Sequence, residues 1–309
     1  MIARLGWVGA FVLACGLGVC NAQQARGPAK DAGIKLEATP ALWKVKGAHG
    51  TVYLFGSVHV MRKDVHWETP KIKSAFASSD VLYLEIPEVD PSAAQAMQPM
   101  IMKLGMDPDH PLSTKIGKDD VALLDAAVRK LGLPGESALE SMQPWLVYIT
   151  LSVLPSVQAG YDPASGIDPA MLAEARAAKK TVKAFETAEQ QVHFLADFPQ
   201  AEQVALLHEA LTDLPRNAGQ MDEVVGDWTR GDVDRIASLD NDELKDKHPA
   251  LYDKLLVQRN AHFADVLAGI LKDPATGTVF VTVGAAHLAG PDSVQKMLEK
   301  HGFAATREQ

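Results

Sequence analysis

Short apolar runs alternate with longer segments of helical periodicity along most of this chain. Four runs are rich in β-branched and aromatic residues and are bounded by turn-forming residues, so they predict buried strands at residues 51–55, 81–86, 181–185 and 278–283. Apolar residues at helical spacing predict helices over 92–104, 118–131, 138–153, 169–179, 188–196, 200–213, 217–229, 249–271 and 292–300. This alternation is typical of an α/β fold, in which helices flank a largely parallel central sheet.

Two segments add to this plan. Residues 41–55 (ALWKVKGAHGTVYLF) form two apolar runs around a Gly-Ala-His-Gly sequence, which predicts a hairpin. The middle of the chain, about residues 92 to 160, is rich in helical patterns and in methionine, and we expect it to form a helical cap over the sheet. Methionines on such helices would suit an apolar substrate, although methionine on helices more often simply fills a core.

The composition is that of an ordinary globular protein with a substantial core: 309 residues, of which 47% are hydrophobic and 22% charged. It excludes a disordered tail, a fibrous repeat and a small disulfide-stapled scaffold. The net charge of −9 gives no electrostatic footprint for nucleic acid or for an anionic membrane, so neither is expected as a partner. The composition leaves two classes of protein open, an enzyme and a ligand-binding protein.

The first 22 residues follow the layout of a secretory signal peptide: Arg4, an uncharged apolar run, and Ala22 at a small-residue boundary. Cleavage there would remove both cysteines, and lipoprotein processing at Cys15 is the alternative. Residues 23–38 then predict a flexible tether and 39–309 a single α/β domain. No other stretch approaches the roughly 20 apolar residues of a membrane span. We therefore expect an exported protein, periplasmic or secreted, without an integral membrane segment in its mature form.

Two of the predicted strands run into the same motif, Gly-x-x-His. Residues 51–55 are followed by Gly56-Ser57-Val58-His59, and 278–283 by Gly284-Ala285-Ala286-His287. In an open parallel sheet, ligands bind outside the carboxyl ends of the strands, where both histidines fall. We expect each glycine to let the chain turn sharply. Each histidine alone is better explained as a capping or hydrogen-bonded loop residue, but the two together favour a functional site.

Charged residues occupy three further positions of interest. Glu85 lies near the end of 81–86, before Pro87, where a carboxylate is costly unless it is paired or bound to a cation; the alternative is an edge residue facing water. Glu186 follows 181–185, where a loop role fits as well as a site role. Arg259 falls within the apolar stripe of 249–271, and a buried arginine needs a carboxylate or a ligand oxyanion. It suits both a structural pair with one of the glutamates and an electrostatic clamp.

These residue types favour metal chemistry at the sheet edge. Two imidazoles and one carboxylate can hold a divalent ion with open positions. Such an ion lowers the pKa of bound water and so generates a nucleophile for hydrolysis, while Arg259 would stabilise the oxyanion. Asp168, in Gly166-Ile167-Asp168-Pro169, predicts a helix N-cap followed by proline rather than a catalytic group. The chain has no His-Glu-x-x-His, Gly-x-Ser-x-Gly or Gly-rich phosphate motif, which disfavours an ordinary zincin, an α/β-hydrolase and a phosphate-loop protein.

An ordered set of motifs resembles the TraB/PrgY/GumN family, which includes the Tiki proteins. In chain order the set is Leu54-Phe55-Gly56-Ser57-Val58-His59-Val60, Tyr83-Leu84-Glu85, Gly166-Ile167-Asp168, Glu186-Thr187 with Gln190, Arg259-Asn260, and Val283-Gly284-Ala285-Ala286-His287-Leu288. The resemblance is to the exported bacterial GumN-like branch. It implies an α/β fold related to the erythromycin-esterase (EreA) and ChaN-like proteins, with two pseudo-symmetric halves that each contribute a Gly-x-x-His. It also implies a metallopeptidase, because Tiki-type members are metal-dependent peptidases supported by manganese or cobalt.

The prediction is therefore a metal-dependent hydrolase that cleaves peptide bonds in a peptide or protein substrate outside the cytoplasm. His59, Glu85 and His287 would hold a divalent ion, with Mn or Co favoured over Zn. Glu85 and Arg259 would be catalytic, and Asp168, Glu186 and Asn260 would surround them. The alternative, drawn from the PrgY-like and ChaN-like relatives, is a non-catalytic periplasmic protein that binds a peptide or haem.

Overall fold

The computed structural model describes residues 38–309 except 88, 90, 134–136, 138 and 215–218. The predicted signal peptide, Cys15 and all but the last residue of the predicted tether lie outside the described residues. The described residues fall into two compact units. Of the described residues, the sheet unit comprises those from Ala38 to Val89, Ala164–Thr187 and Asp222–Gln309, and the helical unit comprises those within Asp90–Pro163 and Ala188–Met221.

The sheet unit contains a mixed sheet with the strand order β4-β3-β5-β2-β1-β6. Its strands are β1 (Leu42–Lys46), β2 (Thr51–Ser57), β3 (Val81–Leu84), β4 (Thr181–Ala184), β5 (Thr278–Gly284) and β6 (Ala305–Arg307). The adjacent strands β4, β3, β5 and β2 are parallel to one another. Strand β1 pairs antiparallel with β2 and β6. The predicted α/β fold, the four predicted strands and the β1–β2 hairpin are confirmed, whereas β6 was not predicted. The prediction that all four strands are buried was wrong for β4, an edge strand in which no residue is buried.

The position of β5 brings the candidate residues together. This last long strand lies between β2 and β3, and pairs in parallel with both. Ser57 at the end of β2 is opposite Gly284 at the end of β5, and Glu85 follows β3 directly. The carboxyl ends of three adjacent strands therefore meet at one edge of the sheet, which is where ligands bind in parallel α/β sheets.

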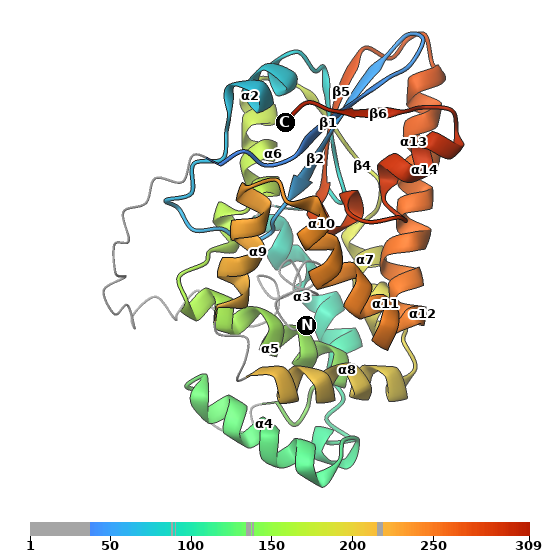
Figure 1. Ribbon diagram of the computed structural model, residues 1–309. Helices are drawn as coiled ribbons and strands as arrows, with labels where there is room; N and C mark the ends of the chain where they lie inside the picture. The colour runs from blue at the N-terminus through green and yellow to red at the C-terminus, as the bar shows by residue number, and fades with distance from the viewer. Residues whose placement is uncertain (1–37, 88, 90, 134–136, 138, 215–218) are drawn as a thin grey trace. The chain divides into compact units, whose positions relative to one another are not determined.

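Helices cover both faces of this sheet (Figure 1). On one side lie α2 (Pro70–Ala77) and α6 (Ile167–Ala177), and on the other α13 (Gln258–Lys272) and α14 (Val294–Lys300). Phe280 of β5 packs edge-on against Phe76 of α2, with ring centroids 5.5 Å apart. On the opposite face, valines of β2 and β5 join Phe263 and Leu267 of α13 in a fully buried core. Burial of these apolar side chains fixes α13 on the sheet.

A chain of short helices precedes α13 in the sheet unit. It consists of α9 (Gln220–Thr229), α10 (Val233–Ile236), the π-helix η6 (Ala237–Asp242), α11 (Glu243–Lys247), α12 (Pro249–Tyr252) and the π-helix η7 (Asp253–Val257). The 3₁₀ helices η4 (Pro163–Ser165) and η8 (Ala285–Leu288) lie elsewhere in the chain. The single helix predicted over 249–271 is therefore divided into α12, η7 and α13. π-Helical turns of this kind occur frequently at functional sites.

The helical unit is built around α5 (Pro144–Gln158), which is buried almost all round. The other helices are α3 (Pro91–Gly105), η2 (Leu112–Thr114), α4 (Lys118–Lys130), α7 (Ala188–Ala196) and α8 (Gln200–Asp213). Helix α5 begins at Pro144 rather than at the predicted residue 138, because proline suits the first turn of a helix. Among the described residues, no helix is both long and apolar enough to cross a membrane.

Candidate active site

Arg259 of α13 is the centre of the site and is only 4% exposed. Its Nε and Nη2 atoms donate to the two carboxylate oxygens of Glu186, each at 2.8 Å, and Nη2 also donates to Glu85 Oε2 at 2.6 Å. Its Nη1 atom donates to the Leu255 carbonyl at 3.1 Å and faces His287 Nε2 at 3.0 Å. A guanidinium group has five N–H donors, so this set of contacts uses all of them. Both glutamates that the sequence offered as partners of Arg259 are bound to it.

The charge of Arg259 keeps Glu85 ionised. Burial raises the pKa of the Glu85 carboxyl, but the charge of Arg259, together with smaller contributions from His287, His59 and the Gly284 N–H, outweighs burial and holds that pKa well below its usual range. The Gly284 N–H contributes as well, because it donates to Glu85 Oε1 at 2.6 Å. This bond ties the residue after β3 to the end of β5. Two Glu residues raise the pKa of Arg259 still further, against the opposing effect of burial.

Two side chains fix the orientation of His287. Asn260, the residue after Arg259, donates from Nδ2 to the Asp292 carbonyl at 2.8 Å, so its Oδ1 faces His287 Nδ1 at 2.5 Å. An amide oxygen only accepts, so Nδ1 carries the proton and Nε2 presents its lone pair to Arg259. Burial, reinforced by the charge of Arg259, lowers the pKa of His287 to about 3, so the imidazole is neutral. Its Nε2 also lies 3.6 Å from Glu85 Oε1.

His59 is held by a different partner. Its Nδ1 lies 2.8 Å from Asp168 Oδ2 on α6, and its side chain remains 21% exposed. Burial lowers the pKa of His59, but the hydrogen bond and charge of Asp168 outweigh it, so the net shift is upward. The N-cap prediction for Asp168 was wrong: Gly166 is the N-cap, and Asp168 lies in the first turn of α6. Ile167 N–H instead donates to the Val58 carbonyl at 3.1 Å, which sets α6 against the turn that carries His59.

The two motif glycines do not act as predicted. Neither Gly56 nor Gly284 is among the described glycines with positive φ, and both belong to strands. A Cβ atom on Gly56 would lie 3.0 Å from both Cα and Cβ of Ala285. Glycine at this position therefore allows the two His-bearing turns to touch each other, rather than allowing either to bend sharply.

The site contains more negative than positive charge. Glu85 and Glu186 bind the guanidinium, and the Asp168 carboxylate binds His59. The formal charge of these groups is −2 with both imidazoles neutral, and −1 when His59, whose pKa is raised, is protonated. His59 is coupled electrostatically to Glu85 and Arg259, which shows that the two groups of residues share one field. In a buried setting such an excess favours the binding of a cation.

One known protein family and several relatives match most of the chain. The sequence profile of the TraB/PrgY/gumN family matches residues 41–307. The chain belongs to this family. Its relatives include the "Uncharacterized protein YbaP" of Escherichia coli (strain K12), 25% identical over 250 residues that span 80% of this chain and 87% of YbaP. An "Uncharacterized protein" of Treponema pallidum (strain Nichols) is 22% identical over 275 residues, 84% of this chain and 80% of that protein. No solved structure matches.

The residues of this family member suit a divalent ion in type and charge, and one pair suits it in spacing. Imidazole and carboxylate ligands bind Mn, Co and Zn. The 3.6 Å between His287 Nε2 and Glu85 Oε1 is close to the roughly 3.4 Å that separates two ligand atoms about 2.1 Å from a tetrahedral ion. In the part of the chain that the structure describes, no group of three His, Cys, Asp or Glu side chains is already arranged around an ion.

Sequence reasoning missed three residues that bind the backbone of the His-bearing turns: Trp228, Asn241 and Gln295. All three are buried, and their side-chain N–H groups donate to carbonyls of the two turns. Gln295 of α14, for example, donates to the Leu288 carbonyl at 2.6 Å. They sit in ordinary amphipathic helical patterns, and their partners are distant in sequence except for that of Gln295. No local pattern could have distinguished them.

Proposed function

We propose that this protein is a metal-dependent hydrolase of peptide bonds in which His59, Glu85 and His287 hold a divalent ion, Mn or Co in preference to Zn. The observation that carries the proposal is the acidic excess of the site beside two imidazoles whose Nδ1 atoms are engaged by Asp168 and Asn260. Such partners orient a metal-binding histidine and assign coordination to Nε2. The assignment of peptide bonds as the substrate rests on the family resemblance.

Glu85 fits the role of a ligand better than that of a general base. A carboxylate with a pKa held far below neutrality takes up protons poorly, whereas an ionised carboxylate is a strong ligand. The chemistry that a divalent ion supplies when bound is Lewis acidity, which lowers the pKa of a coordinated water and polarises a carbonyl.

Arg259 acts in this proposal through its charge. In the metal-free chain all five of its donors have partners, one of them His287 Nε2. An ion on His287 Nε2 would replace the bond from Arg259 Nη1, and this N–H could then donate to a negative oxygen nearby. Its second role is to hold Glu85 and Glu186 in place, which fixes one ligand before substrate arrives. Glu186 neutralises part of the guanidinium charge and keeps it buried.

The test is the stoichiometry and affinity of Mn²⁺, Co²⁺ and Zn²⁺ binding, measured by calorimetry on the purified chain. We expect one ion per chain in the wild type and its loss in His59→Ala and His287→Ala. His193→Ala is the matched control, because His193 pairs with Asp197 on the surface of the helical unit. The folding of each variant is followed by circular dichroism. Failure of the folded wild type to bind any ion would overturn the metal mechanism.

Hydrolysis is tested separately with a peptide library incubated with the Mn²⁺-loaded chain and read by mass spectrometry. Cleavage that requires the ion and disappears in His287→Ala supports the proposal. Tight ion binding with no cleavage of any peptide would contradict the hydrolase function and leave a metal-dependent binding protein.

A further inference from the structure

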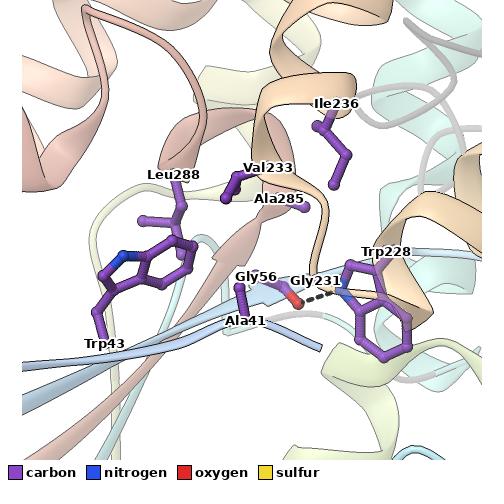
Figure 2. A pocket seen from close by; sticks show the side chains of 9 residues that line it. All are labelled: Ala41, Trp43, Gly56, Trp228, Gly231, Val233, Ile236, Ala285 and Leu288. Carbon is purple, nitrogen blue, oxygen red and sulfur yellow. Dashed lines mark hydrogen bonds between the residues drawn. The ribbon is translucent and has the colours of Figure 1, made fainter. Parts of the chain in front are cut away.

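One helical segment contacts both His-bearing turns. Residues 228–241, from the end of α9 through α10 and η6, are called the brace here. At one end, Trp228 donates from Nε1 to the Gly56 carbonyl at 2.8 Å, a fully buried bond that Figure 2 shows. Gly56 opens the first Gly-x-x-His motif, three residues before His59.

At the other end of the brace, Asn241 binds the second turn on either side of His287. Its Nδ2 donates to the Ala286 carbonyl at 3.0 Å and to the Ala289 carbonyl at 2.9 Å, and the residue is 3% exposed. The two hydrogens of one amide group thus take up two carbonyls that flank the candidate ligand. Asn241 belongs to the π-helix η6, the kind of distorted turn that recurs near functional sites.

Between these two bonds the brace packs across both turns. Gly231, Val233 and Ile236 line an apolar pocket whose opposite wall includes Gly56 and Ala285 (Figure 2). In the 3₁₀ turn η8, Ala285 and Leu288 are three residues apart and so share one side, which lines this pocket. His287 is on another side, bound to Asn260 and Arg259. The turn therefore separates an apolar wall from the polar site.

We infer that Trp228 and Asn241 are positioning residues that set the separation of His59 and His287. Because the brace binds one turn at each of its ends, a shift at either end moves one histidine relative to the other. Neither residue touches the proposed ion. The expected effect on metal affinity rests on the proposed function. The expected displacement of the histidines does not.

The experiment compares two brace variants with two matched controls in the purified chain. Trp228→Phe and Asn241→Leu each remove the side-chain N–H donors of the brace. Trp145→Phe removes a buried indole that donates to the Leu104 carbonyl at 3.4 Å in the helical unit. Gln203→Leu removes a buried amide that there bridges the Ala196 and Phe198 carbonyls at 3.2 and 2.8 Å.

Two readouts are taken on each variant. Mn²⁺ affinity should fall about 10- to 100-fold in the brace variants, as is typical when the residues supporting a ligand are lost, and stay within about threefold in the controls. In the metal-free chain labelled with ¹⁵N-histidine, the ring signals of His59 should shift in Trp228→Phe and those of His287 in Asn241→Leu. The controls should lower thermal stability without moving either signal.

The outcomes separate the two proposals. Unshifted ring signals in both brace variants, or equal losses of affinity in variants and controls, overturn the brace. If the wild type binds no Mn²⁺ but the ring signals shift as expected, the proposed function fails and the brace stands. Should Asn241→Leu not fold, Asn241→Gln keeps the donors on a longer stem, and a displaced His287 signal is still expected.

Discussion

At the scale of single residues, the site depends on the buried guanidinium of Arg259, which lies between the buried carboxylates of Glu85 and Glu186. Replacing Arg259 by Leu removes the positive charge that faces the buried carboxylates of Glu85 and Glu186, which should lower the free energy of unfolding by about 3–5 kcal/mol at pH 7. Without the guanidinium, burial raises the pKa of the Glu85 carboxyl, so it takes up a proton as the pH falls and the deficit should shrink near pH 4.5.

Urea unfolding of Arg259→Leu and wild type at both pH values measures this effect. Arg129→Leu is the control, because Arg129 pairs with Asp125 on an exposed helix face, where such a bond contributes only about 0.5 kcal/mol. A deficit as small as that of the control, or one that grows towards low pH, would contradict the account of Arg259.

The second prediction at this scale concerns His59 and Asp168. Asp168→Asn keeps the shape of the partner but removes its charge, so the pKa of His59 should fall. A raised folded-state pKa stabilises the fold fully below the unfolded value of about 6.5, and this contribution is lost as the pH rises through the folded value. The stability difference between wild type and variant should therefore be larger at pH 5.5 than at pH 8.5, by roughly 1.4 kcal/mol for each unit of change in pKa. NMR titration of the ring and denaturation at the two pH values check it; an equal difference at both pH values rejects it.

At the scale of elements, the structure explains the glycine of the first motif by contact rather than by conformation. Gly56→Ala places a methyl group against the backbone of Ala285, which has little freedom to move, and should destabilise the fold by about 1–3 kcal/mol. The matched change is Gly269→Ala in the middle of α13, where no atom lies within 4 Å of the new Cβ. Alanine there should stabilise the helix by about 0.5–1 kcal/mol. Thermal and urea unfolding compare the two, and two changes of the same sign would refute the close-contact explanation.

The elements also show what the sequence could and could not predict. The four parallel strands were predictable because β-branched runs between turn residues carry their own signal, and the residues that follow these strands were predictable with them. The exposure of β4 was not, because its run resembles those of the buried strands. The three-residue strand β6 carries no such signal. The apolar stripe over 249–271 gave no sign of η7, because a π-helical turn differs from an α-helical one in its hydrogen bonds rather than in its residues.

At the scale of the whole molecule, partners distant in sequence were predictable only where burial demanded them. Arg259 in an apolar stripe required a carboxylate, and Glu85 and Glu186 were its candidates at the edge of the same sheet. The indole of Trp228 and the amide of Asn241 donate to backbone carbonyls, and any N–H donor could do the same. Their partners can therefore be identified only from the fold. The same limit applied to Asp168, whose position before proline favoured a local cap over a partner 109 residues away.

The last prediction concerns the whole chain and its export. Residues 1–22 combine one cation, an apolar run and a small-residue boundary, so expression in a Gram-negative bacterium should yield a periplasmic protein that begins at Gln23. Cell fractionation followed by intact-mass and N-terminal peptide analysis measures this directly. The mature chain would contain no cysteine, so it should not react with a thiol reagent after denaturation, whereas the full-length chain would react at Cys15 and Cys20. A chain that begins at an acylated Cys15 would instead establish lipoprotein processing. An intact 33.2 kDa chain in the cytoplasmic fraction would contradict export, and would place any hydrolysis inside the cell.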